Sequence, residues 1–165
     1  MKDMITDAAI TLEEAVNFIW DEAEILDRQD YDAWLPLWAE DAGFYVIPIN
    51  PDSDDFANEL NLAYDNEGMR KARAQRLQGG FSISAAPPAK TVRTVSRFKI
   101  VGAEGDRVTI TAAQHVVEDK FGRQRMFAAN LKYTLVKTED GIRIHEKIVR
   151  LLNSDGVLTS ISYLF

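Results

Sequence analysis

Few side chains in this sequence could carry metal or redox chemistry. Histidine occurs only at His115 and His145, and cysteine does not occur at all. Without cysteine the chain can form no disulfide, no thiolate nucleophile and no cysteine-ligated metal or iron–sulfur site. An iron site of two histidines and one carboxylate would need both histidines, yet they lie 30 positions apart in no ligand-like spacing. We therefore expect no metal site and no cofactor in this chain.

Three clustered aspartates are the other candidate for ion binding. Asp52, Asp54 and Asp55 follow the turn-forming residues Asn50 and Pro51. A calcium loop needs more oxygen ligands than these, at fixed offsets along the chain. We therefore expect a solvated loop that caps the next segment.

Length and composition limit the kind of fold that could hold a functional site. The chain has 165 residues, of which 46% are hydrophobic, so we expect one domain over residues 1–165 with residues 1–10 flexible. The start of the chain lacks the basic-then-apolar order of a secretory signal, and no apolar run approaches the ~20 residues of a bilayer span. We expect a soluble cytoplasmic protein with no membrane partner. The pI of about 4.9 argues against a nucleic-acid partner, because phosphate binding needs a basic field.

Charge is divided unevenly along the chain. Residues 1–67 hold 18 acids against two bases, whereas residues 68–165 hold 17 bases against 8 acids. Two interpretations are open: the halves neutralise each other within one domain, or they steer self-assembly or partner binding. The basic segment Arg70–Arg76 belongs to this pattern, and we expect it to pair with the acidic half of a neighbouring chain.

Helices are expected in the first half. Thr11 and Glu14 form a capping box, and apolar residues then follow helical spacing to about residues 27–29. Asp30 can cap a short helix whose stripe includes Trp34 and Trp38, which we expect to be core residues, and Pro36 should split that helix. A further helix is expected at about residues 66–78. Residues 44–49 predict a strand, with Pro48 at its end or at a sheet edge, and residues 56–64 are ambiguous.

Strands are expected in the second half. Alternating residues over 91–101, 107–118, 125–137 and 142–153 are separated by short turns, which predicts antiparallel pairing. The fold class is therefore α+β, with N-terminal helices packed on a long, strongly curved, mostly antiparallel sheet. The helices would leave a partly apolar opposite face that could pack on another chain.

The order of these elements resembles the NTF2-like (SnoaL-like) α+β cone, and the chain as a whole resembles the small (β) subunit of aromatic-ring-hydroxylating dioxygenases. The pieces that carry the second resemblance are Glu24–Asp27 with Tyr31–Trp34, Leu37–Asp41 leading into Tyr45–Pro48, Leu62–Asp65, Arg76-Leu77, Pro87-Pro88 with Thr91–Arg93, and Gly156–Phe165. They occur in order over nearly the full length. The family's more basic run after the prolines is replaced here by Ala89–Ser96.

This resemblance implies a structural role without catalytic residues. The β subunit would form a homotrimer and scaffold an α3β3 oxygenase that acts in the catabolism of aromatic hydrocarbons. The Rieske 2Fe-2S cluster and the mononuclear iron are expected in the partner α subunit. Ferredoxin and reductase partners would serve it indirectly.

An enzyme is the alternative, because NTF2-like cones also make isomerases and dehydratases whose pocket lies inside the cone. The main pocket candidates are Tyr31, Tyr45 and His115, and Asp27 and Tyr133 could accompany them. The isomerase pattern places its general base five residues past Asp41, at a position that holds a valine here. That departure disfavours an isomerase, and a dehydratase or a small-molecule-binding module stays open.

The end of the sequence is unusually apolar. Residues 156–165 include Tyr163, Leu164 and Phe165, and such a segment must be buried in its own sheet or in a partner. We expect it to help close the trimer or to pack on the α subunit.

Overall fold

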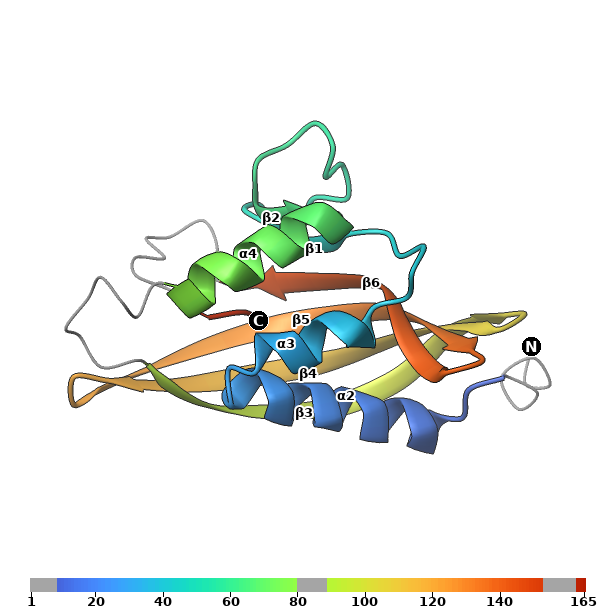
Figure 1. Ribbon diagram of the computed structural model, residues 1–165, viewed down its shortest axis with the longest axis horizontal. Coiled ribbons are helices and arrows are strands. Elements are labelled where there is room, and N and C mark those ends of the chain that lie inside the picture. The colour runs from blue at the N-terminus through green and yellow to red at the C-terminus, as the bar shows by residue number, and fades with distance from the viewer. Residues whose placement is uncertain (1–8, 80–88, 153–162) are drawn as a thin grey trace.

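The computed structural model describes residues 9–79, 89–152 and 163–165. It has helices on one side of a long twisted sheet, as Figure 1 shows. Helix α2 (Leu12–Asp27) begins at the predicted capping box: the Glu14 amide donates to Thr11 Oγ1, and the Thr11 amide donates to the Glu14 carboxylate, both at 3.1 Å. Its apolar side packs along β3.

The second helical unit is divided as expected. Asp30 caps α3 (Tyr31–Trp34) by accepting a hydrogen bond from the Ala33 amide, and a 3-10 turn, η1 (Leu35–Leu37), follows at Pro36. Helix α4 (Glu67–Gly79) lies over the other end of the sheet. In the ranges described, no helix is both long enough and apolar enough to cross a membrane.

The sheet has six strands in the described residues, in the order β2-β1-β6-β5-β4-β3. These are β1 (Tyr45–Pro48), β2 (Asn61–Asp65), β3 (Lys90–Glu104), β4 (Arg107–Lys120), β5 (Arg123–Thr138) and β6 (Gly141–Leu151). Strands β3 to β6 form the predicted antiparallel meander. The fold is therefore α+β, as the sequence predicts.

Strand β1 lies inside the sheet. It pairs antiparallel with β2 and parallel with β6, and the ambiguous segment supplies β2. Pro48 closes β1, where the register shifts after Ile47. The strand-end interpretation of Pro48 is therefore confirmed, and the edge interpretation is wrong because a strand pairs on either side. Proline is tolerated there because its missing N–H falls where regular pairing stops.

One face of the sheet is buried and the other is open. Along β4 the residues at even positions from Val108 to Glu118 point inward and are buried, while His115 and Val117 point outward. The inner face, the helices and residues 163–165 enclose the core, which includes Trp34 and Trp38 as predicted. This inner space is where any pocket of a cone would lie.

Candidate functional site

A carboxylate sits at the centre of the core. Glu22 of α2 is 1% exposed. Its Oε2 accepts from the Trp34 indole nitrogen at 3.0 Å and from Lys147 Nζ at 2.9 Å, and its Oε1 accepts from the Tyr133 hydroxyl at 2.5 Å. The three partners come from α3, β5 and β6. Such complete pairing is what keeps a buried carboxylate tolerable, since an unpaired charge is strongly penalised in an apolar interior.

Lys147 is the matching buried cation. It is fully buried, and besides Glu22 its ammonium donates to the backbone oxygen of Phe165 at 2.9 Å. Burial lowers the pKa of Lys147, and the Glu22 carboxylate opposes this fall. For Tyr133, burial comes first and Glu22 second in raising its pKa well above the usual value. A tyrosine held this firmly in its neutral form, bonded to a paired carboxylate, is a poor proton-transfer group at neutral pH.

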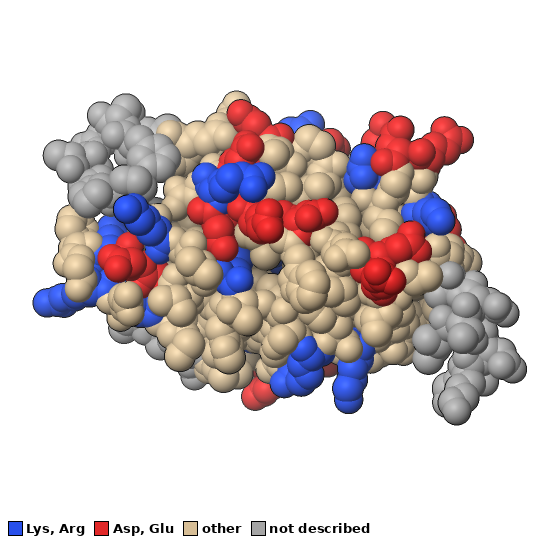
Figure 2. Space-filling view, turned by 90° about the horizontal axis from the view of Figure 1, so that it is seen from below, with Lys and Arg blue, Asp and Glu red and all other residues tan. Residues whose placement is uncertain are grey.

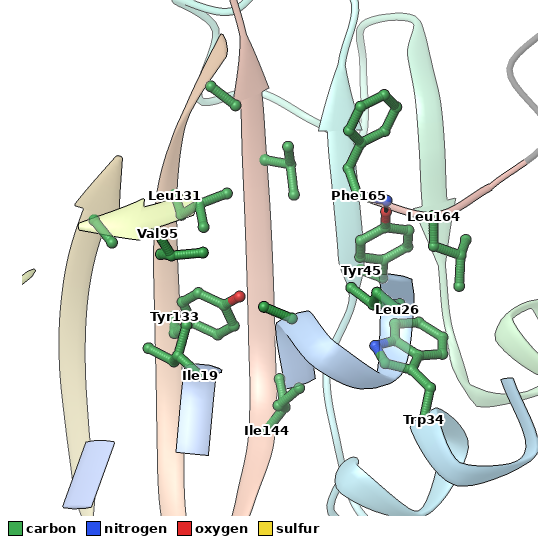
Figure 3. Packing of buried hydrophobic residues seen from close by; sticks show 14 of the residues in the cluster. Ile19, Leu26, Trp34, Tyr45, Val95, Leu131, Tyr133, Ile144, Leu164 and Phe165 are labelled. Atoms are coloured by element: carbon green, nitrogen blue, oxygen red, sulfur yellow. Dashed lines mark hydrogen bonds between the residues drawn. The ribbon is translucent and has the colours of Figure 1, made fainter. Parts of the chain in front are cut away.

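The last three residues fill the space beside this cluster. Tyr163, Leu164 and Phe165 are each at most 4% exposed. Figure 3 shows Phe165 above Tyr45, whose hydroxyl accepts a hydrogen bond from the Phe165 amide at 3.1 Å. These residues are buried within their own chain, so the expectation that they contact a partner chain is wrong. Residues 156–162 of the same prediction lie outside the described ranges.

Two ion pairs fasten this segment. The buried Arg93 guanidinium pairs with Asp27 and also donates to the backbone oxygen of Leu164. On the neighbouring strand, Glu118 accepts the Tyr163 hydroxyl and pairs with Arg125. Asp27 is therefore engaged in an ion pair and is not a free general base.

The expected pocket residues are not brought together. Tyr31 and Tyr45 lie in the core, 1% and 0% exposed, whereas His115 lies exposed on the outer face of β4. Burial raises the pKa of Tyr31 to about 12, and that of Tyr45 is raised further. The grouping of Tyr31, Tyr45 and His115 as one catalytic pocket is therefore wrong, because the pleat of β4 turns His115 away from the cone.

The histidines also fail to approach each other. His115 is on β4 and His145 on β6, and β5 runs between these strands. His145 Nε2 lies 3.4 Å from the guanidinium of Arg107, a poor neighbour for a metal ion. Among the described residues no group of three histidine, aspartate or glutamate side chains could hold a metal. With no cysteine in the sequence, the donor set does not fit a Rieske cluster or a facial-triad iron.

An open hollow of about 270 Å³ lies between η1 and α4. Trp38 lines it, and the Arg70 guanidinium stacks 3.9 Å from the Trp38 ring while donating to the Gly43 backbone oxygen. At its rim Lys71 pairs with Glu67 at 3.1 Å. Arg70 and the Lys71–Glu67 pair are thus engaged within the chain, so this hollow lacks the convergent free polar groups that are typical of a ligand site.

The uneven charge of the chain is largely resolved within the fold. Glu22–Lys147, Asp27–Arg93, Asp54–Arg150 and Asp65–Arg73 each join an acid of the first half to a base of the second. On the surface, Figure 2 shows acidic and basic groups side by side on the face seen from below. The expected pairing of Arg73 with a neighbouring chain is thus replaced by a pair with Asp65 of its own chain, at 2.5 Å.

Sequence reasoning missed the central charged pair, although part of its signal was present. Glu22 lies three residues after Ile19 and four before Leu26, on the apolar stripe of its helix. Lys147 alternates with the buried Val149 and Leu151 on β6. A charged residue on the apolar stripe of a helix predicts that a buried residue of opposite charge pairs with it. The helical spacing does not identify that partner.

Comparison with known proteins identifies the family. The family model for the ring hydroxylating beta subunit matches residues 21–156. The anthranilate 1,2-dioxygenase small subunit of Acinetobacter baylyi is 26% identical over 148 residues, covering 86% of this chain and 90% of that protein.

Solved structures support the same fold. The β subunit of benzoate 1,2-dioxygenase from Burkholderia mallei aligns with a TM-score of 0.77 at 24% identity, covering 94% of this chain and 98% of that one. An NTF2-like protein with a cystatin-like fold from Novosphingobium aromaticivorans aligns with a TM-score of 0.60 at 19% identity, covering 86% and 81%. The expectation of an NTF2-like cone is thus confirmed, and the chain belongs to the family of ring-hydroxylating dioxygenase β subunits.

Proposed function

We propose that this chain is a non-catalytic scaffold subunit, forming one domain over residues 1–165, in a cytoplasmic Rieske-type oxygenase of composition α3β3 that acts in aromatic compound catabolism. The main support for this proposal is that the chain belongs to the β-subunit family and that side chains fill the interior of its cone. Where a catalytic NTF2-like protein needs an open pocket, this chain places the Glu22–Lys147 pair and Phe165. Its contribution to turnover is then made through assembly and stability.

The redox groups of such an oxygenase are assigned to the α subunit. Two findings support this assignment: the sequence has no cysteine, and the described residues contain no group of three histidine, aspartate or glutamate side chains that could hold a metal. When bound in the α subunit, a Rieske cluster and a mononuclear iron supply electron transfer and dioxygen activation, and ferredoxin and reductase would feed them. The present chain holds the α subunits in place.

The outer face of the sheet is the surface we assign to the homotrimer. Val92, Val117 and Met126 stand side by side on β3, β4 and β5, because Val92 pairs with Val117 and Val117 with Met126. Their exposures are 66%, 39% and 63%, and His115 lies next to them along β4. A contiguous exposed apolar row on a sheet face favours a protein partner.

Purification from source cells tests the assembly. A tagged copy of the chain should co-purify with a larger subunit in equimolar amounts, with the native mass of a hexamer and iron confined to the larger chain. A visible spectrum of the Rieske type should accompany it. Recovery of an iron-free homo-oligomer with no second subunit would contradict the scaffold assignment.

A surface variant tests the trimer face separately. Met126→Lys should lower the native mass of the isolated chain, measured by light scattering, while the chain still unfolds cooperatively on heating. Leu60→Lys is the matched control, because Leu60 is 79% exposed and precedes β2, away from this face. An unchanged mass for Met126→Lys would rule out this face as the contact.

A further inference from the structure

The interior of the cone holds Phe165 much as a binding site holds a ligand. The backbone oxygen of Phe165 accepts from Lys147 Nζ at 2.9 Å and from Gln114 Nε2 at 3.3 Å, and its amide donates to the Tyr45 hydroxyl. Its ring meets that of Phe127 edge-on, with 5.6 Å between centroids. Polar side chains thus bind the backbone of Phe165, and the Phe127 ring packs against its side chain.

The two side chains that donate to the Phe165 oxygen, Gln114 and Lys147, are polar groups in an apolar core. Gln114 is 2% exposed and Lys147 is fully buried. A polar group in an apolar interior is destabilising unless it is hydrogen-bonded. Within the described part of the chain the Gln114 side-chain amide donates to the Phe165 oxygen, and Lys147 donates to the same oxygen in addition to Glu22. These donors are therefore arranged around an oxygen atom at this position.

The last two residues, Leu164 and Phe165, are also held through backbone atoms. Arg93 donates to the backbone oxygen of Leu164, as Lys147 and Gln114 do to that of Phe165. Such contacts recognise an oxygen or carboxylate group and do not depend on the peptide being part of this chain. A small molecule with the same groups could satisfy the same donors.

We infer that the cone interior is a binding site for a small molecule that carries an aromatic ring and a carboxylate, and that Tyr163–Phe165 is its intramolecular occupant. The carboxylate takes the place of the Phe165 backbone oxygen between Lys147 and Gln114, and the ring packs on Phe127. The segment and the ligand compete, so binding is weak until the segment withdraws. This inference goes beyond the scaffold role and does not rest on it.

The test uses the full-length chain and 3-phenylpropionate, which reproduces the ring, its two-carbon spacer and the oxygen of Phe165. The double variant Leu164→Ser/Phe165→Gly weakens the hold on the segment and leaves every anchoring group in place. Titration calorimetry should show binding at least about tenfold tighter than for the unaltered chain. The control Leu152→Ser/Phe121→Gly removes the same atoms from positions 64% and 65% exposed and should bind no better than the unaltered chain.

A second substitution separates carboxylate recognition from a simple apolar cavity. Adding Gln114→Leu to the double variant should weaken 3-phenylpropionate binding about tenfold and leave the binding of neutral propylbenzene unchanged. No binding by the double variant, or equal binding of both compounds with no effect of Gln114→Leu, would overturn the inference. If the double variant does not fold alone, 3-phenylpropionate should restore its cooperative thermal transition, and failure to do so counts equally against the site.

Discussion

Strand β4 presents two different surfaces from neighbouring residues. Val116 is fully buried and Val117 is 39% exposed, and the same alternation separates the buried Gln114 from the exposed His115. The inner surface joins helices, sheet and residues 163–165 through charged hydrogen bonds, whereas the outer surface carries the exposed apolar row of Val92, Val117 and Met126. The contrast separates the inner contacts, which stabilise the fold, from the outer apolar row, to which we assign the proposed homotrimer contact.

The largest expected effect comes from breaking the inner charge pair. Glu22→Leu leaves Lys147 buried without its carboxylate, so it should lower the free energy of unfolding by about 3–5 kcal/mol in urea denaturation. The double variant Glu22→Leu/Lys147→Met should recover most of that loss, because no lone charge then remains buried.

The control for this pair is an ion pair on the outside. Asp54, whose side chain is 90% exposed, pairs with Arg150 at 2.7 Å. If Glu22→Leu costs no more than Asp54→Asn, the central role given to the inner pair is incorrect.

The adjacent residues Val116 and Val117 allow the same substitution to be compared on the inner and the outer face of β4. Val116→Ala should cost about 2 kcal/mol, because it leaves a cavity in the core. Val117→Ala should cost under about 1 kcal/mol in folding stability and should instead weaken self-association. Urea unfolding and native mass measure the two effects, and equal losses of stability for both variants would remove the distinction between the faces.

The tyrosine in the inner network should give a smaller effect that depends on pH. Tyr133→Phe removes a hydrogen bond to Glu22 and should cost about 1.5 kcal/mol at pH 8. The pKa of Tyr133 is raised in the folded state above its usual value of 10, so its contribution is present below pH 10 and is lost as the pH rises further. The stability gap between the two proteins should therefore narrow above pH 10.

Thermal unfolding at pH 8, 10 and 11 measures that gap. The pKa of Lys147 is lowered in the folded state, so its effect on stability has the opposite sign: stability increases as the pH rises towards 10.5, the usual pKa of lysine. This effect is present in both proteins and does not change the gap between them. A gap that widens with pH would contradict the assigned protonation state of Tyr133.

The smallest effect is expected at the outer ion pair. Asp54→Asn should lower the unfolding free energy by less than about 1 kcal/mol, because an exposed pair is screened by solvent. The loss should shrink further in 1 M salt, where charge screening is strong. A larger, salt-independent loss would show that the loop carrying Asp54 matters to the fold beyond its charge.

Local features of the fold could be predicted from the sequence because their causes are local. The capping box at Thr11 and Glu14, the break at Pro36 and the turns between the long strands each depend on residues a few positions apart. The α+β class follows from the same signals. The resemblance to the β-subunit family was also readable from ordered motifs.

The interior could not be predicted because its partners are distant in sequence. Short connections indicate antiparallel neighbours, but no local signal pairs β1 with β6 in parallel. The position of Tyr163–Phe165 could not be predicted for the same reason: an apolar segment indicates burial, but its sequence does not indicate which surface covers it. His115 lies on a correctly predicted strand, but a strand pattern alone does not say which of its two faces meets the helices.

The pairing of Glu22 with Lys147 also has a consequence for the order of folding. The two residues are 125 positions apart, so their contact closes only after β6 has joined the sheet. Proteins dominated by such distant contacts fold on the scale of milliseconds to seconds, because a long loop must close before its contacts form. During synthesis the helix carrying Glu22 emerges well before the strand carrying Lys147, and its carboxylate stays hydrated in the interval. The helix can pack on β3 before then, but its central ion pair is completed only when β6 joins the sheet.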